Sequence, residues 1–136
     1  MSIYVPKPIR KLVIARAGNR CEYCRIPKFI TNYDFHLEHV IGIQHGGNNS
    51  PENLAWCCSF CNWKKGPNIS TVLIDFDDVI PLFNPRKQLW FEHFENQDGF
   101  IVGKTKQGLA TVKLLEFNLR ERVEIRSVLS LAGFYP

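Results

Sequence analysis

Three of the four histidines in this chain lie within residues 35–47, FHLEHVIGIQHGG, together with one glutamate. Histidines beside a carboxylate are typical of three situations: a metal site, acid–base catalysis, or a polar loop with neither chemistry. The neighbouring motifs, and the elements that must position them, decide among the three.

The five cysteines carry the strongest spacing signal. The number of cysteines is odd, and the N-terminus lacks the apolar stretch of a signal peptide. Both features argue against a complete disulfide framework. Cys21 and Cys24 form one CxxC pair and Cys58 and Cys61 a second, which leaves Cys57 over. Two such pairs are typical of a four-thiolate zinc site. The alternatives are a redox dithiol and thiols that are merely buried.

Between the two pairs, the sequence predicts a strand, a loop, a short strand and a helix. Alternation of apolar residues indicates the first strand, and dense Gly, Asn, Ser and Pro indicate the loop. We expect Ser59 to cap the helix and Gly66 to end it. Because strand neighbours alternate, Glu38 and His39 need a bend at the strand end to share a site. The predicted elements span 34–41, 42–53, 54–57 and 59–66.

The flanks predict further helices and a hairpin. A helix should start near Pro8, turn Ile9, Leu12 and Val13 toward the core, and stop at Gly18. Residues 88–96 can form either a short helix or a strand. We expect a hairpin over 99–115 with its turn near 106–108, and a last helix with Asn118 as N-cap and Gly133 at its end. These elements predict one α+β domain over 1–136, with a core at 1–66 and an extension at 67–136.

The charge distribution points to a polyanion. The net charge is only +4, yet residues 1–30 carry seven cations against the single carboxylate of Glu22. A solvated helix face is the alternative interpretation. No apolar run is long enough to cross a membrane, and we expect a cytoplasmic protein with no membrane partner.

Residues 9–66 resemble the HNH endonucleases in their cysteine-knuckle form. The shared pattern is CEYC, the acid–histidine pair of HLEHV, a Gly-Gly loop, Asn-Leu and CSFCNWKKG. The second half also looks like the extension of a group of small bacterial HNH proteins. The resemblance implies a ββα-metal (HNH/His-Me finger) core with two zinc knuckles, followed by a hairpin-plus-helix extension.

The resemblance also implies a reaction, namely DNA hydrolysis that leaves 5′-phosphate and 3′-hydroxyl ends. His39 would be the general base, since imidazole can accept a proton at neutral pH. Glu38 and Asn62 would hold a catalytic ion, for which their oxygens suit Mg²⁺ or Mn²⁺ better than zinc. Asn53 would hydrogen-bond across the loop at Gly46–Gly47 and hold His39 in place.

Other polar residues are weaker candidates. His36 could orient Glu38 or add a ligand, although a polar neighbour without either role is the simpler interpretation. His93 is expected at the surface or in packing. Candidate contacts with DNA phosphates, each with a solvated surface as its alternative, are Arg10, Lys11, His45, Lys64 and Lys65.

Three functional classes therefore remain. The first is a metal-dependent endonuclease with a structural Zn²⁺ and a catalytic Mg²⁺ or Mn²⁺. The second is a catalytically weak, zinc-stabilised nucleic-acid-binding module. The third, a thiol redox protein, is disfavoured by the two ordered CxxC pairs.

Overall fold

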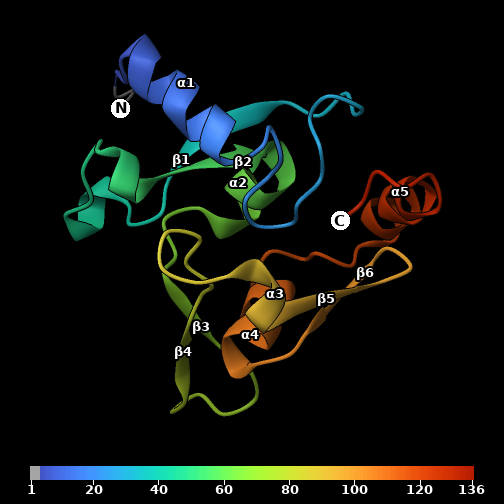
Figure 1. Ribbon diagram of the computed structural model, residues 1–136. Helices are drawn as coiled ribbons and strands as arrows, with labels where there is room; N and C mark the ends of the chain where they lie inside the picture. The colour runs from blue at the N-terminus through green and yellow to red at the C-terminus, as the bar shows by residue number, and fades with distance from the viewer. Residues whose placement is uncertain (1–3) are drawn as a thin grey trace.

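The computed structural model describes residues 4–136 as a mixed α/β arrangement of short elements (Figure 1). Three two-stranded antiparallel sheets each pair strands that are neighbours in sequence. No helix within this part of the chain is long and apolar enough to cross a membrane.

The first half contains two helices, one sheet and two single 3₁₀ turns in the loop. Strands β1 and β2 pair in register from Phe35 opposite Cys58 to His39 opposite Leu54. The elements are α1 (Lys7–Arg16), β1 (Phe35–His39), η1 (Ile43–His45), η2 (Pro51–Asn53), β2 (Leu54–Cys58) and α2 (Ser59–Lys65). The predicted order of strand, loop, strand and helix is therefore present. Strand β2 is buried along its whole length, which suits its apolar sequence LAWCC.

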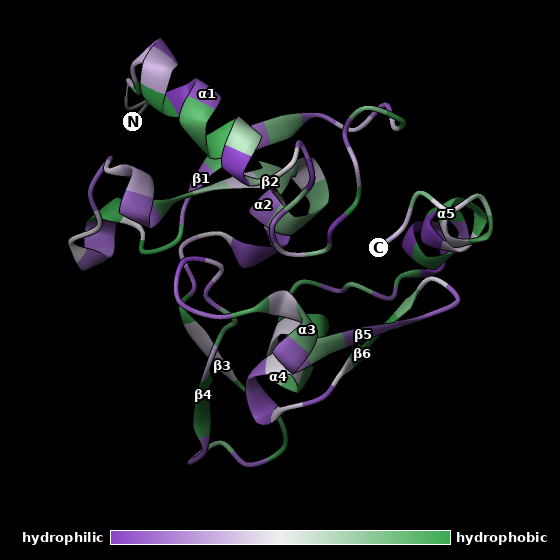
Figure 2. Ribbon diagram, in the orientation of Figure 1, coloured by the Kyte–Doolittle hydropathy of each residue, from purple (hydrophilic) through white to green (hydrophobic). Residues whose placement is uncertain are grey.

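Two details of the predicted helices were wrong. Ser59 is the first residue of α2, whose N-cap is Cys58, and the Ser59 hydroxyl instead donates to the backbone oxygen of Asp34 at 2.8 Å. In α1, Val13 is buried and Ile9 packs against the core, but Leu12 is exposed. Figure 2 shows hydrophilic and hydrophobic residues alternating around α1.

The hairpin predicted over 99–115 was wrong in its position: the second half has a hairpin over 94–103, whose turn lies eight residues earlier than predicted. Its turn is at Asp98 and Gly99, both with positive φ (52° and 96°), and not at 106–108. Residues 106–108 instead open a helix, because the Thr105 hydroxyl caps it by accepting from the Gly108 amide at 3.0 Å. The elements are β3 (Ser70–Val72), β4 (Val79–Pro81), α3 (Trp90–His93), β5 (Phe94–Gln97), β6 (Phe100–Gly103), α4 (Lys106–Leu114) and α5 (Arg120–Leu131).

Asn118 does not cap the last helix as predicted. Its side-chain amide pairs with both backbone groups of Ile101, at 2.9 Å each, and thereby ties the start of α5 to β6. Leu119 is the N-cap, and Gly133 follows the C-cap with φ +82° as expected of a helix end.

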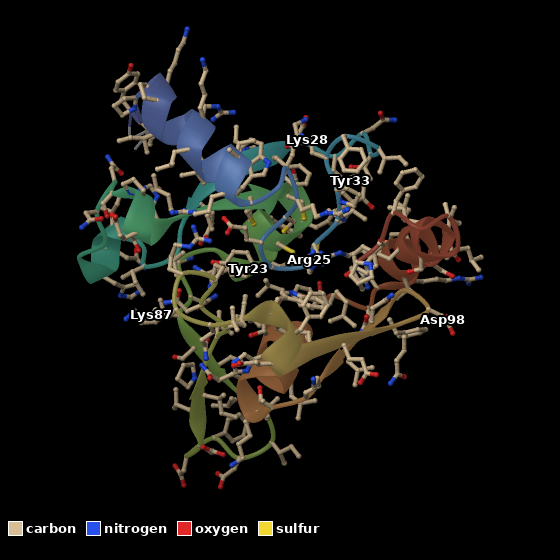
Figure 3. All side chains as sticks on the ribbon, in the orientation of Figure 1. Tyr23, Arg25, Lys28, Tyr33, Lys87 and Asp98 are labelled. Carbon is tan, nitrogen blue, oxygen red and sulfur yellow. The ribbon has the colours of Figure 1, made fainter. Side chains whose placement is uncertain are left out.

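The two halves meet around the first cysteine pair. Figure 3 shows Tyr23 and Arg25 between the N-terminal elements and the α3–β5 region. The indole of Trp90 donates to the Tyr23 backbone oxygen at 2.7 Å, and the hydroxyl of Tyr135 donates to the Cys24 backbone oxygen at 2.6 Å. The extension therefore packs directly on the segment that carries the cysteines.

Candidate active site and metal centre

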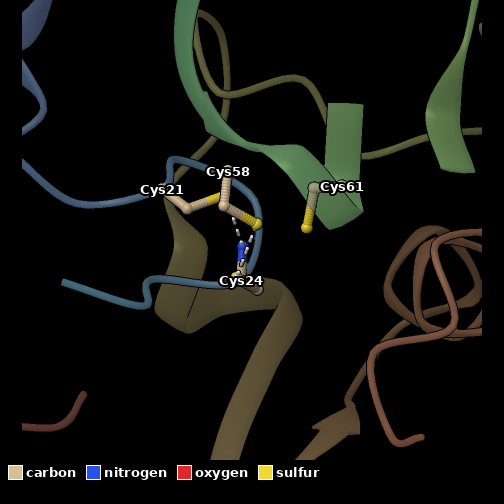
Figure 4. A group of neighbouring side chains, drawn as sticks. All are labelled: Cys21, Cys24, Cys58 and Cys61. Atoms are coloured by element: carbon tan, nitrogen blue, oxygen red, sulfur yellow. Dashed lines mark hydrogen bonds between the residues drawn. The ribbon is translucent and has the colours of Figure 1, made fainter. Parts of the chain in front are cut away.

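The four cysteines of the CxxC pairs come together in the core (Figure 4). Cys21 and Cys24 lie on the turn after α1, Cys58 ends β2, and Cys61 lies in the first turn of α2. All four are buried, and their sulfur atoms lie within 4.8 Å of one another. The structure thus brings together the four cysteines that spacing singled out.

The cluster has the dimensions of a tetrahedral zinc site. Zn–S bonds of about 2.3 Å imply S···S edges of about 3.8 Å, and the sulfurs of Cys24 and Cys58 lie 3.7 Å apart. The backbone amide of Cys24 points at the Cys21 sulfur at 3.5 Å, as in a knuckle that stabilises thiolate charge. Cys57 is buried beside the cluster but is not one of its four members.

A buried arginine from the C-terminal helix completes the surroundings of this cluster. Arg122 is 2% exposed, and its Nη2 lies 3.0 Å from the Cys61 sulfur. Its Nη1 donates to the backbone oxygens of Leu115 and Glu116, at 2.7 and 3.0 Å. Burial opposes the charge on Arg122, but the neighbouring thiolates raise the pKa of its guanidinium above the ordinary value. A permanent positive charge therefore lies next to the thiolates.

A second site, a cavity of about 370 Å³, lies between the end of β1 and helix α2. Glu38, His39, Asn62 and Trp63 are among the residues that line it. Glu38 and His39 are adjacent in the strand, yet both line this cavity because β1 ends at His39. The candidate base and both candidate oxygen ligands thus share one cavity.

Glu38 is held by two buried partners. The Tyr23 hydroxyl donates to its Oε2 at 2.7 Å, and the Lys65 ammonium lies 2.6 Å from its Oε1. Burial raises the pKa of the Glu38 carboxyl, while Lys65 and Tyr23 oppose that shift. Burial and the Glu38 charge raise the pKa of Tyr23 well above its ordinary value, so its hydroxyl remains a donor. Lys65 also donates to the Val40 backbone oxygen at 3.0 Å.

The imidazole of His39 is oriented by Asn49. The His39 Nε2 lies 2.7 Å from the Asn49 side-chain oxygen. An amide oxygen only accepts, so Nε2 carries the proton and Nδ1 of a neutral His39 carries the lone pair. This arrangement leaves Nδ1 as the basic atom.

Asn53 braces the loop that follows His39. Its side-chain oxygen accepts from the Ile41 amide, and its Nδ2 donates to the backbone oxygens of Ile41 and Asn48, each at 2.9 Å. Gly47 packs so tightly here that an added Cβ would lie 1.7 Å from the Ile41 oxygen. The bracing contacts are thus made to Ile41 and Asn48, on either side of the glycine pair.

The other predicted site residues are dispersed. Lys65 is 1% exposed, so its predicted contact with a DNA phosphate was wrong: burial and the ion pair with Glu38 keep it inside. His36 is exposed and its Nε2 lies 3.3 Å from the Ser59 hydroxyl, away from Glu38. His93 is buried and bonded to Thr105, which places it in packing.

The candidate phosphate contacts do not form one patch with the cavity. Lys11 and His45 are exposed, and neither lines the cavity. Arg10 stacks over the ring of Trp56, with 5.2 Å between its guanidinium carbon and the ring centroid. Lys64 forms an ion pair with Glu116 and does not line the cavity.

Three residues at these sites escaped sequence reasoning. Tyr23 lies inside the first CxxC pair, which was a local signal that a side chain there would be buried near the cysteine cluster. Asn49 lay in a loop rich in Asn and Gly, and Arg122 in a helix rich in Arg, so neither stood out from its neighbours. Asn49 lies 10 positions after its partner His39, and Arg122 lies 61 positions after its partner Cys61.

Comparison with protein families gives one match. Residues 21–68 match the model of the HNH endonuclease family, which confirms the resemblance over the segment that carries both sites. Comparison with curated proteins and with solved structures gives no match.

Proposed function

We propose that this chain, whose residues 21–68 match the HNH endonucleases, is a metal-dependent endonuclease acting on DNA. Its core would be a ββα-metal fold formed by β1, β2 and α2. The observation that carries the proposal is the cavity where His39 lies with Glu38 and Asn62. Hydrolysis would leave 5′-phosphate and 3′-hydroxyl ends, in a cytoplasmic protein.

His39 would act as the general base. Its Nε2 is engaged with Asn49, so Nδ1 can take a proton from a water molecule that attacks phosphorus. The proton then rests on an imidazolium whose Nε2–H still donates to Asn49. Asn53 would preserve this geometry indirectly, by bonding both backbone groups of Ile41, two residues after His39.

The donors around His39 fit a hard divalent cation. Glu38 and Asn62 supply oxygen atoms, which Mg²⁺ and Mn²⁺ prefer. A carboxylate offers about four lone-pair sites, so Glu38 keeps acceptor capacity besides Tyr23 and Lys65. A cation held there would neutralise charge on the phosphate and stabilise the leaving 3′ oxygen.

The four-cysteine cluster would have a separate, structural role. A four-thiolate site is closed, with no open position for substrate. Zinc there would join the turn at Cys21 and Cys24 to the start of α2, which carries Asn62. Folding of the cavity would therefore depend on zinc.

One observation favours the second candidate function, a nucleic-acid-binding module with weak or no turnover. Lys65 already supplies Glu38 with a positive charge inside the protein, so a divalent cation must share or displace that contact. If the ion pair of Lys65 with Glu38 persists and excludes the divalent cation, DNA would bind without being cut.

Plasmid cleavage in a series of divalent metals separates the two functions. We expect nicking with Mg²⁺ or Mn²⁺ by the zinc-loaded protein, and a loss of about 10²- to 10⁴-fold in His39→Ala. His36→Ala is the matched control, because His36 is exposed, lies beside the Ser59 hydroxyl and does not line the cavity. Zinc-loaded wild type that binds DNA but nicks with no metal would refute the nuclease. Full activity in His39→Ala would refute its role as base.

A further inference from the structure

Trp63 is a large aromatic side chain on the open side of the cavity. The chain has three tryptophans. Trp56 and Trp90 are buried at 2% and 7% exposure, and the ring nitrogen of each has a hydrogen-bond partner. Trp63 is 75% exposed, so most of its indole contacts solvent. An exposed indole does not contribute the stabilising free energy that a buried one would. Its exposure on this helix is therefore not explained by folding stability.

The position of Trp63 links it to the proposed chemistry. It follows Asn62 on α2 and lines the same cavity as His39 and Glu38. A ligand that places a reacting phosphate beside His39 would therefore have its adjoining groups beside this indole.

A cation accompanies the indole. The Lys64 ammonium lies 4.5 Å from the Trp63 ring centroid, and Lys64 is further held by its ion pair with Glu116. The ammonium and the indole thus lie side by side, with the indole lining the cavity and the Lys64 charge already shared with Glu116. Proteins that bind single-stranded nucleic acids combine these two groups, the cation for the backbone and the ring for a base face.

Regular duplex DNA cannot use an aromatic ring in this way. Its bases are stacked on one another, so a ring can reach a base face only where the stack is interrupted or the base is flipped out. An unpaired or single-stranded nucleotide presents that face without the cost of unstacking.

We infer that Trp63 stacks on a nucleobase next to the scissile phosphate, and that the preferred substrate is DNA with an unpaired base at that position. This inference rests on the proposed nuclease function and specifies its substrate class. Single strands, flaps and mismatched sites belong to this class, and intact duplex does not.

Binding without cleavage tests the inference directly. Zinc-loaded protein, with no other divalent cation added, is titrated with a single-stranded DNA oligonucleotide and with the corresponding duplex. Because Trp63 is the exposed tryptophan, stacking should quench its fluorescence with the single strand and much less with the duplex.

Variants then assign the effect to the ring. In competition with a labelled oligonucleotide, Trp63→Ala should weaken single-strand binding roughly 5- to 150-fold, the range for loss of one stacked base. Trp63→Phe should retain most of the affinity. Phe76→Ala is the matched control, since Phe76 is 85% exposed on the β3–β4 loop, away from α2 in Figure 1. Zinc content verifies that each variant is folded.

The outcomes separate this inference from the proposed function. Equal binding of single strand and duplex, unchanged in Trp63→Ala, would refute stacking even if plasmid is cleaved. Loss of single-strand affinity in Trp63→Ala would support stacking even if no metal permits cleavage. Tighter binding of RNA than of DNA of the same sequence would overturn the assignment to DNA. Unchanged affinity of Trp63→Ala for both DNA and RNA, with Trp63 instead covered by a protein partner, would also overturn the inference.

Discussion

Replacing Lys65 with methionine removes the ammonium from Glu38 while keeping a side chain of similar length. Both residues are nearly inaccessible, with side-chain exposures of 2% and 4%. Breaking a buried ion pair by removing one partner costs about 3–5 kcal/mol, because the other charge is left buried without compensation. We therefore expect Lys65→Met to be among the most destabilising substitutions of a polar residue in this chain.

The size of the thermal shift follows from chain length. An unfolding entropy of about 2.1 cal/mol/K per residue gives about 0.29 kcal/mol/K for 136 residues. A loss of 3–5 kcal/mol then lowers Tm by about 10–17 °C. Thermal unfolding of zinc-loaded protein, followed by circular dichroism, measures this shift.

The double variant Lys65→Met with Glu38→Gln provides the key control. It removes both charges, so it should be more stable than Lys65→Met alone, and the two effects should not add. Lys11→Met controls for loss of an exposed cation. A Tm for Lys65→Met no lower than that of Lys11→Met would refute the reasoning, as would simple additivity.

The same variant reports on the proposed catalytic cation. With Lys65 absent, a divalent cation can take over the charge compensation of Glu38, and binding to the folded state raises stability. Mn²⁺ should therefore raise the Tm of Lys65→Met more than that of the wild type, and should have little effect on the double variant. Equal shifts in all three would mean that Glu38 is not a ligand.

Three further predictions concern zinc, the loop and the basic helix. Cys24→Ser should lose zinc and much of the stability, because metal binding to a structural site contributes to folding. Cys57→Ser should keep one zinc per chain by metal analysis. Loss of zinc in Cys57→Ser would instead make Cys57 one of the ligands. Gly47→Ala should slow cleavage and lower Tm, since the added Cβ would collide with backbone at 1.7 Å, whereas Gly42→Ala, with contacts of 3.7 Å or more, should keep the wild-type Tm. Lys11→Gln should flatten the dependence of log affinity for duplex DNA on log salt by about 0.9 if it contacts a phosphate; an unchanged slope would make it a solvated residue.

The sequence alone determined the four-cysteine cluster and the order of the elements around it. A CxxC turn brings its own two sulfurs together through local backbone geometry, so only the meeting of the two turns had to be inferred. The alternation in β1, the loop composition and the stop residue of α2, Gly66, are likewise local signals. The β5–β6 turn was predicted wrongly near 106–108, although Asp-Gly is a local signal for the positive φ values found at Asp98 and Gly99.

Only the tertiary structure decided which polar groups surround the candidate base and ligands. Lys65 reaches Glu38 across 27 positions of sequence, and Arg122 reaches Cys61 across 61. As a sequence pattern, Lys64 and Lys65 are two equivalent cations at a helix end, yet one stacks on Trp63 at the surface and the other is buried. The reason is physical: α2 can turn only one of two adjacent side chains toward β1, and its packing against the sheet determines which.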